Sequence, residues 1–132
     1  MSHKSVLVVD DEADILLELD EFLTTMGVRC VCASSVAEAM QCLQQNADIC
    51  LIITDLRMPE QSGLRLIQML KDGRAEQPLP IIVTSGHADM ADVITLFRSG
   101  VVDFLPKPIY FDHLIELLER FVPGYSSALP TS

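Results

Sequence analysis

The sequence predicts a doubly wound α/β domain, in which helices cover both faces of a parallel β-sheet. Short apolar runs typical of strands alternate five times with amphipathic segments typical of helices. The runs ICLIIT (49–54) and PIIVT (80–84) are apolar on both faces, as the central strands of such a sheet must be. The length of 132 residues suits one domain with a hydrophobic core and is short for two.

The predicted elements alternate regularly along the chain. The predicted strands cover residues 5–10, 28–33, 49–54, 79–85 and 101–105. The predicted helices cover residues of about 13–26, 35–46, 63–71, 88–99 and 111–121.

The first two strand–helix units have clear local signals. SVLVVD is the first strand, and the helix after it has apolar residues at helical spacing, namely Ile15, Leu19, Phe22 and Met26. Gly27 is placed to end this helix. VRCVCA is the second strand. Ser35 and Glu38 have the spacing of a capping box, which predicts the start of the second helix.

The last three units follow the same pattern. ICLIIT is the third strand, and a helix and a polar loop that contains Pro78 come after it. LPIIVTS is the fourth strand, the fourth helix ends at Gly100, and VVDFL is the fifth strand. The last helix carries the apolar residues Leu114, Ile115, Leu117, Leu118 and Phe121. We expect the domain to cover residues 1–122, with 123–132 a linker-like or frayed tail rich in Pro, Gly and Ser.

The charge of the chain limits its partners. Nine basic and 19 acidic residues give a formal net charge of −10. Such a surface repels phosphate backbones and anionic lipid, so we expect no direct binding to nucleic acid or membrane. No apolar run approaches the roughly 20 residues of a membrane span, and the start MSHKSVLVVDDE lacks the layout of a signal peptide. We therefore expect a cytoplasmic protein.

Four cysteines raise the question of a metal site. Two of them, Cys30 and Cys32, are two residues apart in a predicted strand and point to the same face. No C-x-x-C pair occurs, and no histidine stands nearby in sequence. The sequence therefore favours the interpretation that the cysteines are small buried hydrophobic residues.

Charged and hydroxyl side chains gather where the predicted strands end. The first strand ends in Asp10 and Asp11, the third leads to Asp55, the fourth ends in Ser85, and the fifth leads to Lys107. Ligands of open parallel sheets bind at this carboxyl edge. Each residue also has an ordinary structural interpretation: acidic residues favour a helix start, serine a turn or cap, and a lone lysine a solvated loop. Their coincidence at one edge favours a common site.

The chemistry of such a site follows from its charges. Three carboxylates without histidine or thiolate form a hard oxygen site that suits Mg²⁺ or a similar cation. The cation leaves a carboxylate oxygen of Asp55 able to attack phosphorus, because aspartyl phosphates are an established class of intermediate. The ammonium group of Lys107 and the hydroxyl group of Ser85 can then contact the phosphoryl oxygens. The residues therefore predict phosphorylation of an aspartate.

Four motifs, VLVVDDE, LIITDLRMPEQSG, PIIVTSGHAD and DFLPKP, occur in the order and spacing of one known family. Over residues of about 6–121 the chain resembles the receiver domain of bacterial two-component response regulators, as in CheY. The resemblance implies a flavodoxin-like three-layer sandwich with strand order 2-1-3-4-5, for which a member of this family is a known example.

The resemblance also implies a role for each site residue. Asp55 would be the phosphoacceptor, and Asp10, Asp11, Asp55 and the backbone carbonyl of Arg57 would hold Mg²⁺ or Mn²⁺. Ser85, Lys107 and Phe104 would bind the phosphoryl group or switch with it. The side chains of Arg57 and His87 would tune the lifetime of the phosphoryl group. The resemblance further favours a cis Lys107–Pro108 peptide bond.

The partners implied by the resemblance are a sensor histidine kinase or a phosphotransfer protein. Phosphorylation would alter the face formed by the fourth helix, the fifth strand and the fifth helix, which contacts an output domain, a partner or a second copy of the chain in many relatives. The amino-acid sequences of the motifs most resemble those of receiver domains that are attached to transcriptional activators. The chain would phosphorylate itself with Mg²⁺ and lose the phosphoryl group slowly, without being a turnover enzyme.

Three alternatives remain open on the residues alone. The first is a degenerate receiver that binds a protein without being phosphorylated. The second is a phosphatase that forms an aspartyl phosphate, although such enzymes place a D-x-D motif after the first strand, where this chain has DDE (10–12). The third is a flavin carrier, but the acidic DDEAD stretch would repel the phosphate of FMN.

Overall fold

The computed structural model describes residues 4–58, 63–73, 79–86 and 90–124. In this part of the chain, five strands alternate with five helices. The strands are β1 (Ser5–Val9), β2 (Arg29–Ala33), β3 (Ile49–Asp55), β4 (Ile81–Ser85) and β5 (Asp103–Pro106). The helices are α1 (Ala13–Thr25), α2 (Val36–Gln45), α3 (Gly63–Gly73), α4 (Met90–Arg98) and α5 (Phe111–Phe121).

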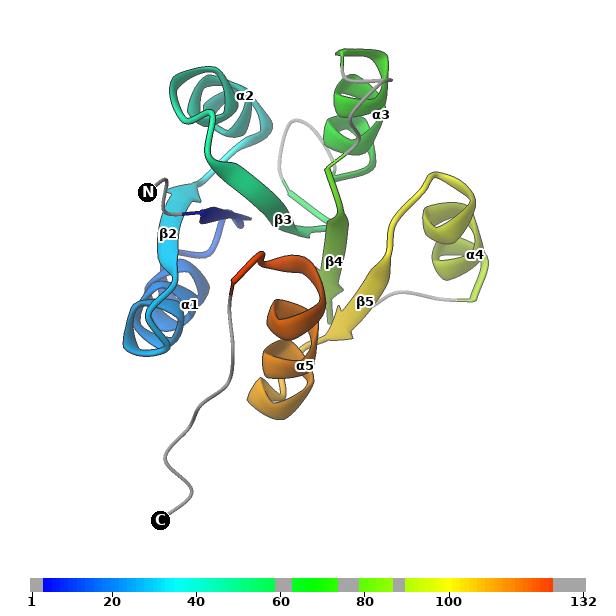
Figure 1. Ribbon diagram of the computed structural model, residues 1–132. Helices are drawn as coiled ribbons and strands as arrows, with labels where there is room; N and C mark the ends of the chain where they lie inside the picture. The colour runs from blue at the N-terminus through cyan, green and yellow to red at the C-terminus, as the bar shows by residue number, and fades with distance from the viewer. Residues whose placement is uncertain (1–3, 59–62, 74–78, 87–89, 125–132) are drawn as a thin grey trace.

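The five strands form one parallel sheet in the order β2-β1-β3-β4-β5. Helices α1 and α5 lie on one side of it, and α2, α3 and α4 lie on the other (Figure 1). This three-layer arrangement confirms the predicted fold class and strand order. The order reverses between β1 and β3, which makes the space beyond their carboxyl ends the expected ligand site.

The hydrophobic core is divided between the two faces of the sheet. Alternate residues of β1 point to opposite faces, so Val6 and Val8 pack with α1 and α5, while Leu7 and Val9 pack with α2, α3 and α4. The central strand β3 is buried along almost its whole length. Strands buried on both faces explain the continuous apolar runs of the sequence, and they make the sheet a rigid support for the residues at its edge.

Two glycines end helices as the sequence predicts. Gly27 follows α1 with a φ angle of +82°, and Gly100 follows α4 with a φ angle of +93°. These left-handed conformations favour glycine because it has no Cβ atom.

The capping box at the start of α2 is only half correct as predicted. The hydroxyl oxygen of Ser35 accepts a hydrogen bond from the backbone N–H of Glu38 at 3.1 Å, as expected. The carboxylate of Glu38, however, accepts from the N–H and hydroxyl of Ser34, at 3.3 and 2.9 Å, and not from Ser35. Ser34 offers two donors to the carboxylate, where the backbone of Ser35 would offer one.

The structure moves several predicted boundaries by one or two residues, the usual uncertainty of element ends. One of the two-residue shifts is in β5, which starts at Asp103 and not at Val101. The N–H of Val101 donates to the carbonyl of Leu96, so this residue closes the end of α4 before the strand begins. The predicted tail falls mostly on residues 125–132, which lie outside the described residues. None of the described helices has both the length and the apolar character needed to cross a membrane.

A candidate phosphorylation site at the carboxyl edge of the sheet

The sheet brings the predicted site residues together at one edge. Asp55 and Ser85 are the last residues of β3 and β4, and Asp10 and Lys107 follow directly after β1 and β5. The parallel register aligns these ends, since Val9 pairs with Thr54, Asp55 with Thr84, and Ser85 with Pro106. Asp10, Asp55 and Ser85 are buried, with exposed fractions of 1%, 5% and 3%.

Lys107 is the cation of this site. Its ammonium nitrogen lies 3.0 Å from Oδ2 of Asp10, 3.5 Å from Oδ1 of Asp55 and 3.7 Å from Oε1 of Glu12. Its backbone N–H donates to the carbonyl of Ser85 at 3.0 Å, which ties the loop after β5 to the end of β4. The Lys107–Pro108 bond is cis, the isomer that the sequence analysis expects. The lysine therefore balances part of the negative charge at the sheet edge.

The environment of Asp55 disfavours its ionised form. Burial raises the pKa of its carboxyl group, and the nearby negative charge of Asp10 raises it further. The positive charge of Lys107 and a hydrogen bond from the backbone N–H of Arg57 lower the pKa, but by less. The pKa of Asp55 is therefore above its ordinary value of 3.8, and a second cation at this edge would stabilise the carboxylate.

The pKa of Lys107 shifts in the direction that keeps it charged. Burial alone would lower this pKa, but the close contact with Asp10 and its charge, followed by the charges of Asp55 and Glu12, outweigh burial and raise it above 10.5. The ammonium group thus stays protonated at neutral pH.

Asp10 has one satisfied and one unsatisfied carboxylate oxygen. Oδ1 accepts a hydrogen bond from the backbone N–H of Glu12 at 2.9 Å. Oδ2 is buried and has no hydrogen-bond partner among the described residues. Its close contact is an ion pair with the ammonium nitrogen of Lys107 at 3.0 Å. This oxygen can still be a ligand for a cation.

The residues present fit a hard divalent cation. Asp10, Asp11 and Asp55 each offer a carboxylate oxygen, and these oxygens all lie within 4.8 Å of one another. Asp11 is exposed and the other two are buried, so the cluster opens to solvent on one side. Oxygen-only coordination with room for water suits Mg²⁺.

The other residues predicted for the site are Phe104, Arg57 and His87, and the structure describes the first two. Phe104, in β5 opposite Val83, is partly buried and packs against the core on the side of α2, α3 and α4. The side chain of Arg57 is exposed, and its backbone N–H contacts Asp55. His87 lies outside the described residues.

Glu12 is a site residue that the sequence analysis did not single out. It contributes a third carboxylate near Lys107 and the backbone N–H that holds Asp10. The DDE run after β1 indicates that acidic residues lie near the site. Three adjacent acidic residues, however, do not show which side chains point to the edge of the sheet. Because the side chain of Glu12 is 61% exposed, its ion pair with Lys107 is expected to be weak.

Comparison with known proteins points to one family. A family model described as the response regulator receiver domain matches residues 6–119. The DNA-binding transcriptional regulator NtrC of Escherichia coli (strain K12) is 31% identical over 126 residues, which cover 95% of this chain and 26% of NtrC. The two-component response regulator PprB of Pseudomonas aeruginosa is 36% identical over 122 residues, which cover 89% of this chain and 43% of PprB. The chain thus spans less than half the length of either relative.

Solved structures have the same fold. A response regulator receiver protein from Pseudomonas putida superposes with a TM-score of 0.83 at 39% identity, covering 91% of this chain and 98% of that one. The chemotaxis protein CheY4 of Vibrio cholerae superposes with a TM-score of 0.83 at 22% identity, covering 92% of this chain and 100% of that one. The second similarity is a similarity of fold alone.

Proposed function

The chain belongs to the response regulator receiver domain family, and from this premise we propose that Asp55 accepts a phosphoryl group from a histidine kinase or a phosphotransfer protein. One observation carries the proposal. A buried carboxylate with a raised pKa lies 3.5 Å from a half-buried lysine, at the point where the strand order reverses. Burial destabilises the ionised form of Asp55, and the residue lies where ligands of this fold bind. Both features are typical of a reactive carboxylate that is modified chemically.

The transfer uses groups that are already in place. A carboxylate oxygen of Asp55 forms a bond to phosphorus while the bond between phosphorus and the donor imidazole nitrogen breaks, and that nitrogen keeps the electron pair. Negative charge on the transferring group spreads over its equatorial oxygens. The Lys107 ammonium group can contact one of these oxygens, and the hydroxyl group of Ser85 can donate to another.

We propose that Asp10, Asp11 and Asp55, with the backbone carbonyl of Arg57, hold Mg²⁺ or Mn²⁺. The grouping of the three carboxylates supports this assignment, as does the buried oxygen Oδ2 of Asp10, whose charge is offset only by the nearby Lys107 ammonium group among the described residues. When bound, the cation supplies positive charge that offsets the carboxylates and the incoming phosphoryl oxygens.

Phosphorylation would then bias the face formed by α4, β5 and α5. Ser85 ends the strand next to β5, and Phe104 lies one residue from the β5 residue paired with Thr84. A contact of Ser85 that forms only when the phosphoryl group is present can shift Ser85 and Phe104 from one side-chain conformation to another. Three large apolar or aromatic side chains at α4 and just before α5 are exposed, Ile94 at 45%, Phe97 at 48% and Tyr110 at 70%. Such side chains favour this face as a contact surface for an output domain, a partner or a second copy of the chain.

The output is proposed from the relatives. NtrC of Escherichia coli and FixJ of Rhizobium meliloti are described as transcriptional regulators, and FixJ is 34% identical over 120 residues. Because this chain covers 57% of FixJ and 26% of NtrC, regulation of transcription would require a region beyond the receiver domain.

Phosphorylation with a small donor tests the proposal. The purified chain is incubated with acetyl phosphate and Mg²⁺, and its intact mass is measured. We expect the mass of one phosphoryl group on the wild type, no adduct on Asp55→Asn, and no adduct when EDTA replaces Mg²⁺. Asp14→Asn, which removes an acidic residue in the first turn of α1, should keep the adduct. A wild type that stays unmodified would instead support a receiver that only binds proteins.

A further inference from the structure

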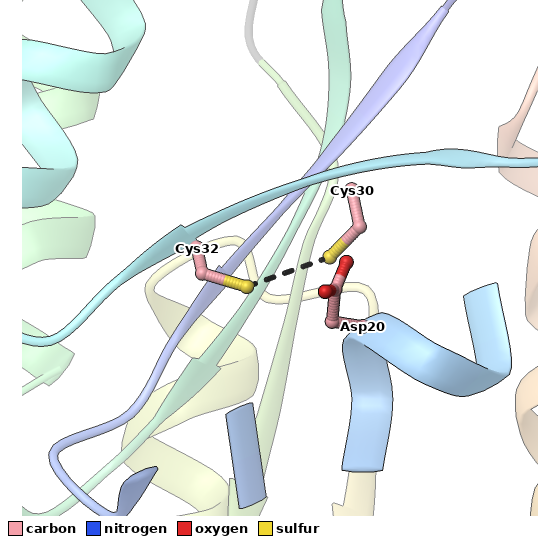
Figure 2. Close-up of side chains that lie close together, drawn as sticks. All are labelled: Asp20, Cys30 and Cys32. Carbon is pink, nitrogen blue, oxygen red and sulfur yellow. Dashed lines mark hydrogen bonds between the residues drawn. The ribbon is translucent and has the colours of Figure 1, made fainter. Parts of the chain in front are cut away.

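A second cluster of metal-binding side chains lies between α1 and β2. It consists of Asp20 from α1 and of Cys30 and Cys32 from β2 (Figure 2). Each residue offers one ligand atom, and the three atoms lie within 4.8 Å of one another. None of these residues belongs to the candidate phosphorylation site.

The backbone explains why the three side chains converge. Cys30 and Cys32 pair with Val6 and Val8 of β1 in a regular parallel register. Residues two apart in a strand point to the same face, which here is the face covered by α1. Asp20 lies in the second half of α1 and directs its carboxylate toward the sulfur of Cys30 (Figure 2). The cluster therefore joins a helix to the edge strand of the sheet.

The distance between the two sulfur atoms fits a tetrahedral metal. The Sγ atoms of Cys30 and Cys32 are 3.8 Å apart. With Zn–S bonds of about 2.3 Å and a tetrahedral angle, two thiolates on one zinc ion are separated by about 3.8 Å.

A disulfide fits the same residues poorly. It requires Cβ atoms about 3.5–4.5 Å apart, whereas residues two apart in an extended strand are separated by about 6.6 Å. The regular pairing of both cysteines with β1 would have to break to close that gap.

We propose that Asp20, Cys30 and Cys32 bind a thiophilic divalent cation of the zinc class, which fastens α1 to the edge strand β2. Two thiolates and one carboxylate form a softer ligand set than the three carboxylates at the sheet edge, so the two sites select different cations. Water would complete the tetrahedron. Cys30 also lines an open surface hollow of ≈ 330 Å³ with Thr24, Gly27, Val28 and Arg29, so one of the three ligand residues borders solvent.

Deprotonation of the thiols makes binding of the cation dependent on pH. Burial raises the pKa of Cys30, and the neighbouring Cys32 and Asp20 raise it further. Burial also raises the pKa of Cys32. The contact with Cys30 lowers this pKa, and the charges of Asp20 and Cys42 raise it, so that the net shift is upward. A metal ion binds the thiolate form of cysteine, so binding of the cation releases thiol protons to solvent. The affinity for the cation should rise with pH.

Competition for zinc tests the proposal on the whole chain. The reduced protein, freed of metal by a chelator, is titrated with Zn²⁺ against a chromophoric chelator in excess Mg²⁺, which occupies the carboxylate cluster. We expect one Zn²⁺ ion per wild-type chain, bound more tightly as the pH rises. The Cys30→Ser/Cys32→Ser variant should bind it more weakly by at least the roughly 10- to 100-fold loss that follows removal of a group supporting a metal ligand. Asp20→Asn should lose part of the affinity.

A matched variant controls for the loss of two thiols. Cys42→Ser/Cys50→Ser removes the two cysteines that lie outside the cluster and should bind zinc as the wild type does. Cd²⁺ provides a second readout, since a thiolate-to-cadmium absorption band should appear in this variant and be absent from Cys30→Ser/Cys32→Ser. Circular dichroism checks the fold of each variant, and Asp20→Asn serves alone if a double variant is unfolded. Equal zinc affinity in the wild type and in Cys30→Ser/Cys32→Ser would overturn the proposal. If a double variant is unfolded, equal zinc affinity in the wild type and in Asp20→Asn would overturn it.

Discussion

The ammonium nitrogen of Lys107 lies 3.0 Å from Oδ2 of Asp10, a buried carboxylate oxygen with no hydrogen-bond partner among the described residues. The same nitrogen is 3.5 Å from Asp55. One lysine thus stabilises two buried carboxylates that repel each other. The edge of the sheet keeps an excess of negative charge, and both the stability of the domain and its affinity for cations should depend on this excess.

Replacing Lys107 should destabilise the domain. Lys107→Met leaves Asp10 and Asp55 without their cation, and we expect a loss of about 2–3 kcal/mol in the free energy of unfolding at neutral pH without divalent metal. This is less than the roughly 3–5 kcal/mol for a fully buried pair, because the lysine side chain is 16% exposed. Urea unfolding with EDTA measures the loss.

The pH dependence gives the Lys107→Met prediction a second test. The raised pKa of Lys107 means that its contribution is complete below 10.5 and is lost as the pH rises through the higher pKa of the folded state. On the acid side, the difference should shrink as Asp55 takes up a proton. Lys4→Met, at an exposed position, should change the free energy of unfolding by less than about 0.5 kcal/mol. Equal stability of the two variants would contradict the ion-pair account.

Asp55→Asn should stabilise the domain when no divalent metal is present. The pKa of Asp55 is raised in the folded state, so its ionisation lowers stability at neutral pH. We therefore expect Asp55→Asn to have a higher free energy of unfolding than the wild type at neutral pH. The gain should vanish below pH 3.8, where the carboxyl group is protonated in both states. Urea unfolding between neutral pH and pH 3 measures the gain. A loss of stability in Asp55→Asn at neutral pH would show that the ionised carboxylate of Asp55 does not destabilise the fold.

Mg²⁺ should stabilise the wild type through the carboxylate cluster. A ligand at ten times its Kd adds about 1.4 kcal/mol to the free energy of unfolding, and thermal melting with and without MgCl₂ measures the effect. Asp10→Asn and Asp11→Asn should remove most of the increment due to Mg²⁺, whatever their effect on the melting temperature without metal. Asp14→Asn should retain it. An increment that survives in Asp10→Asn would place the cation elsewhere.

Ser85→Ala should separate phosphorylation from switching. The variant keeps Asp55 and Lys107, so acetyl phosphate should still modify it. The phosphorylation-dependent change in hydrogen exchange at β5 and α4 should be largely lost, because the hydroxyl contact with the phosphoryl group is missing. Ser99→Ala removes a hydroxyl that donates to the carbonyl of Thr95, away from Asp55, and should leave the change intact. The same exchange response in Ser85→Ala and in the wild type would exclude a switching role for Ser85.

Most of the fold could be predicted from the sequence because hydrophobic patterning sets the type of each element. Strands buried on both faces leave continuous apolar runs such as ICLIIT, and the site follows from asking which residue ends each run. The start of β5 could not be predicted, since Val101 and Val102 have strand character while a hydrogen bond to α4 holds Val101 outside the strand. Local propensity does not reveal such a contact.

The cluster at Asp20 shows a second limit of sequence reasoning. The two cysteines are visible as a same-face pair in VRCVCA, but the third ligand comes from a helix ten residues earlier. Only the packing of α1 on β2 brings that carboxylate to the sulfur atoms. For the same reason, the sequence favoured an ordinary hydrophobic role for these thiols.

The most direct test of the account is to locate the phosphoryl group. The wild type is phosphorylated with acetyl phosphate and Mg²⁺, the acyl phosphate is reduced with borohydride, and the peptides are mapped by mass spectrometry. Reduction converts a phosphorylated aspartate to homoserine, and the account predicts homoserine at position 55 and at no other aspartate. Homoserine at Asp10 or Asp11, or an unmodified residue 55 in a chain that carries the phosphoryl mass, would contradict it.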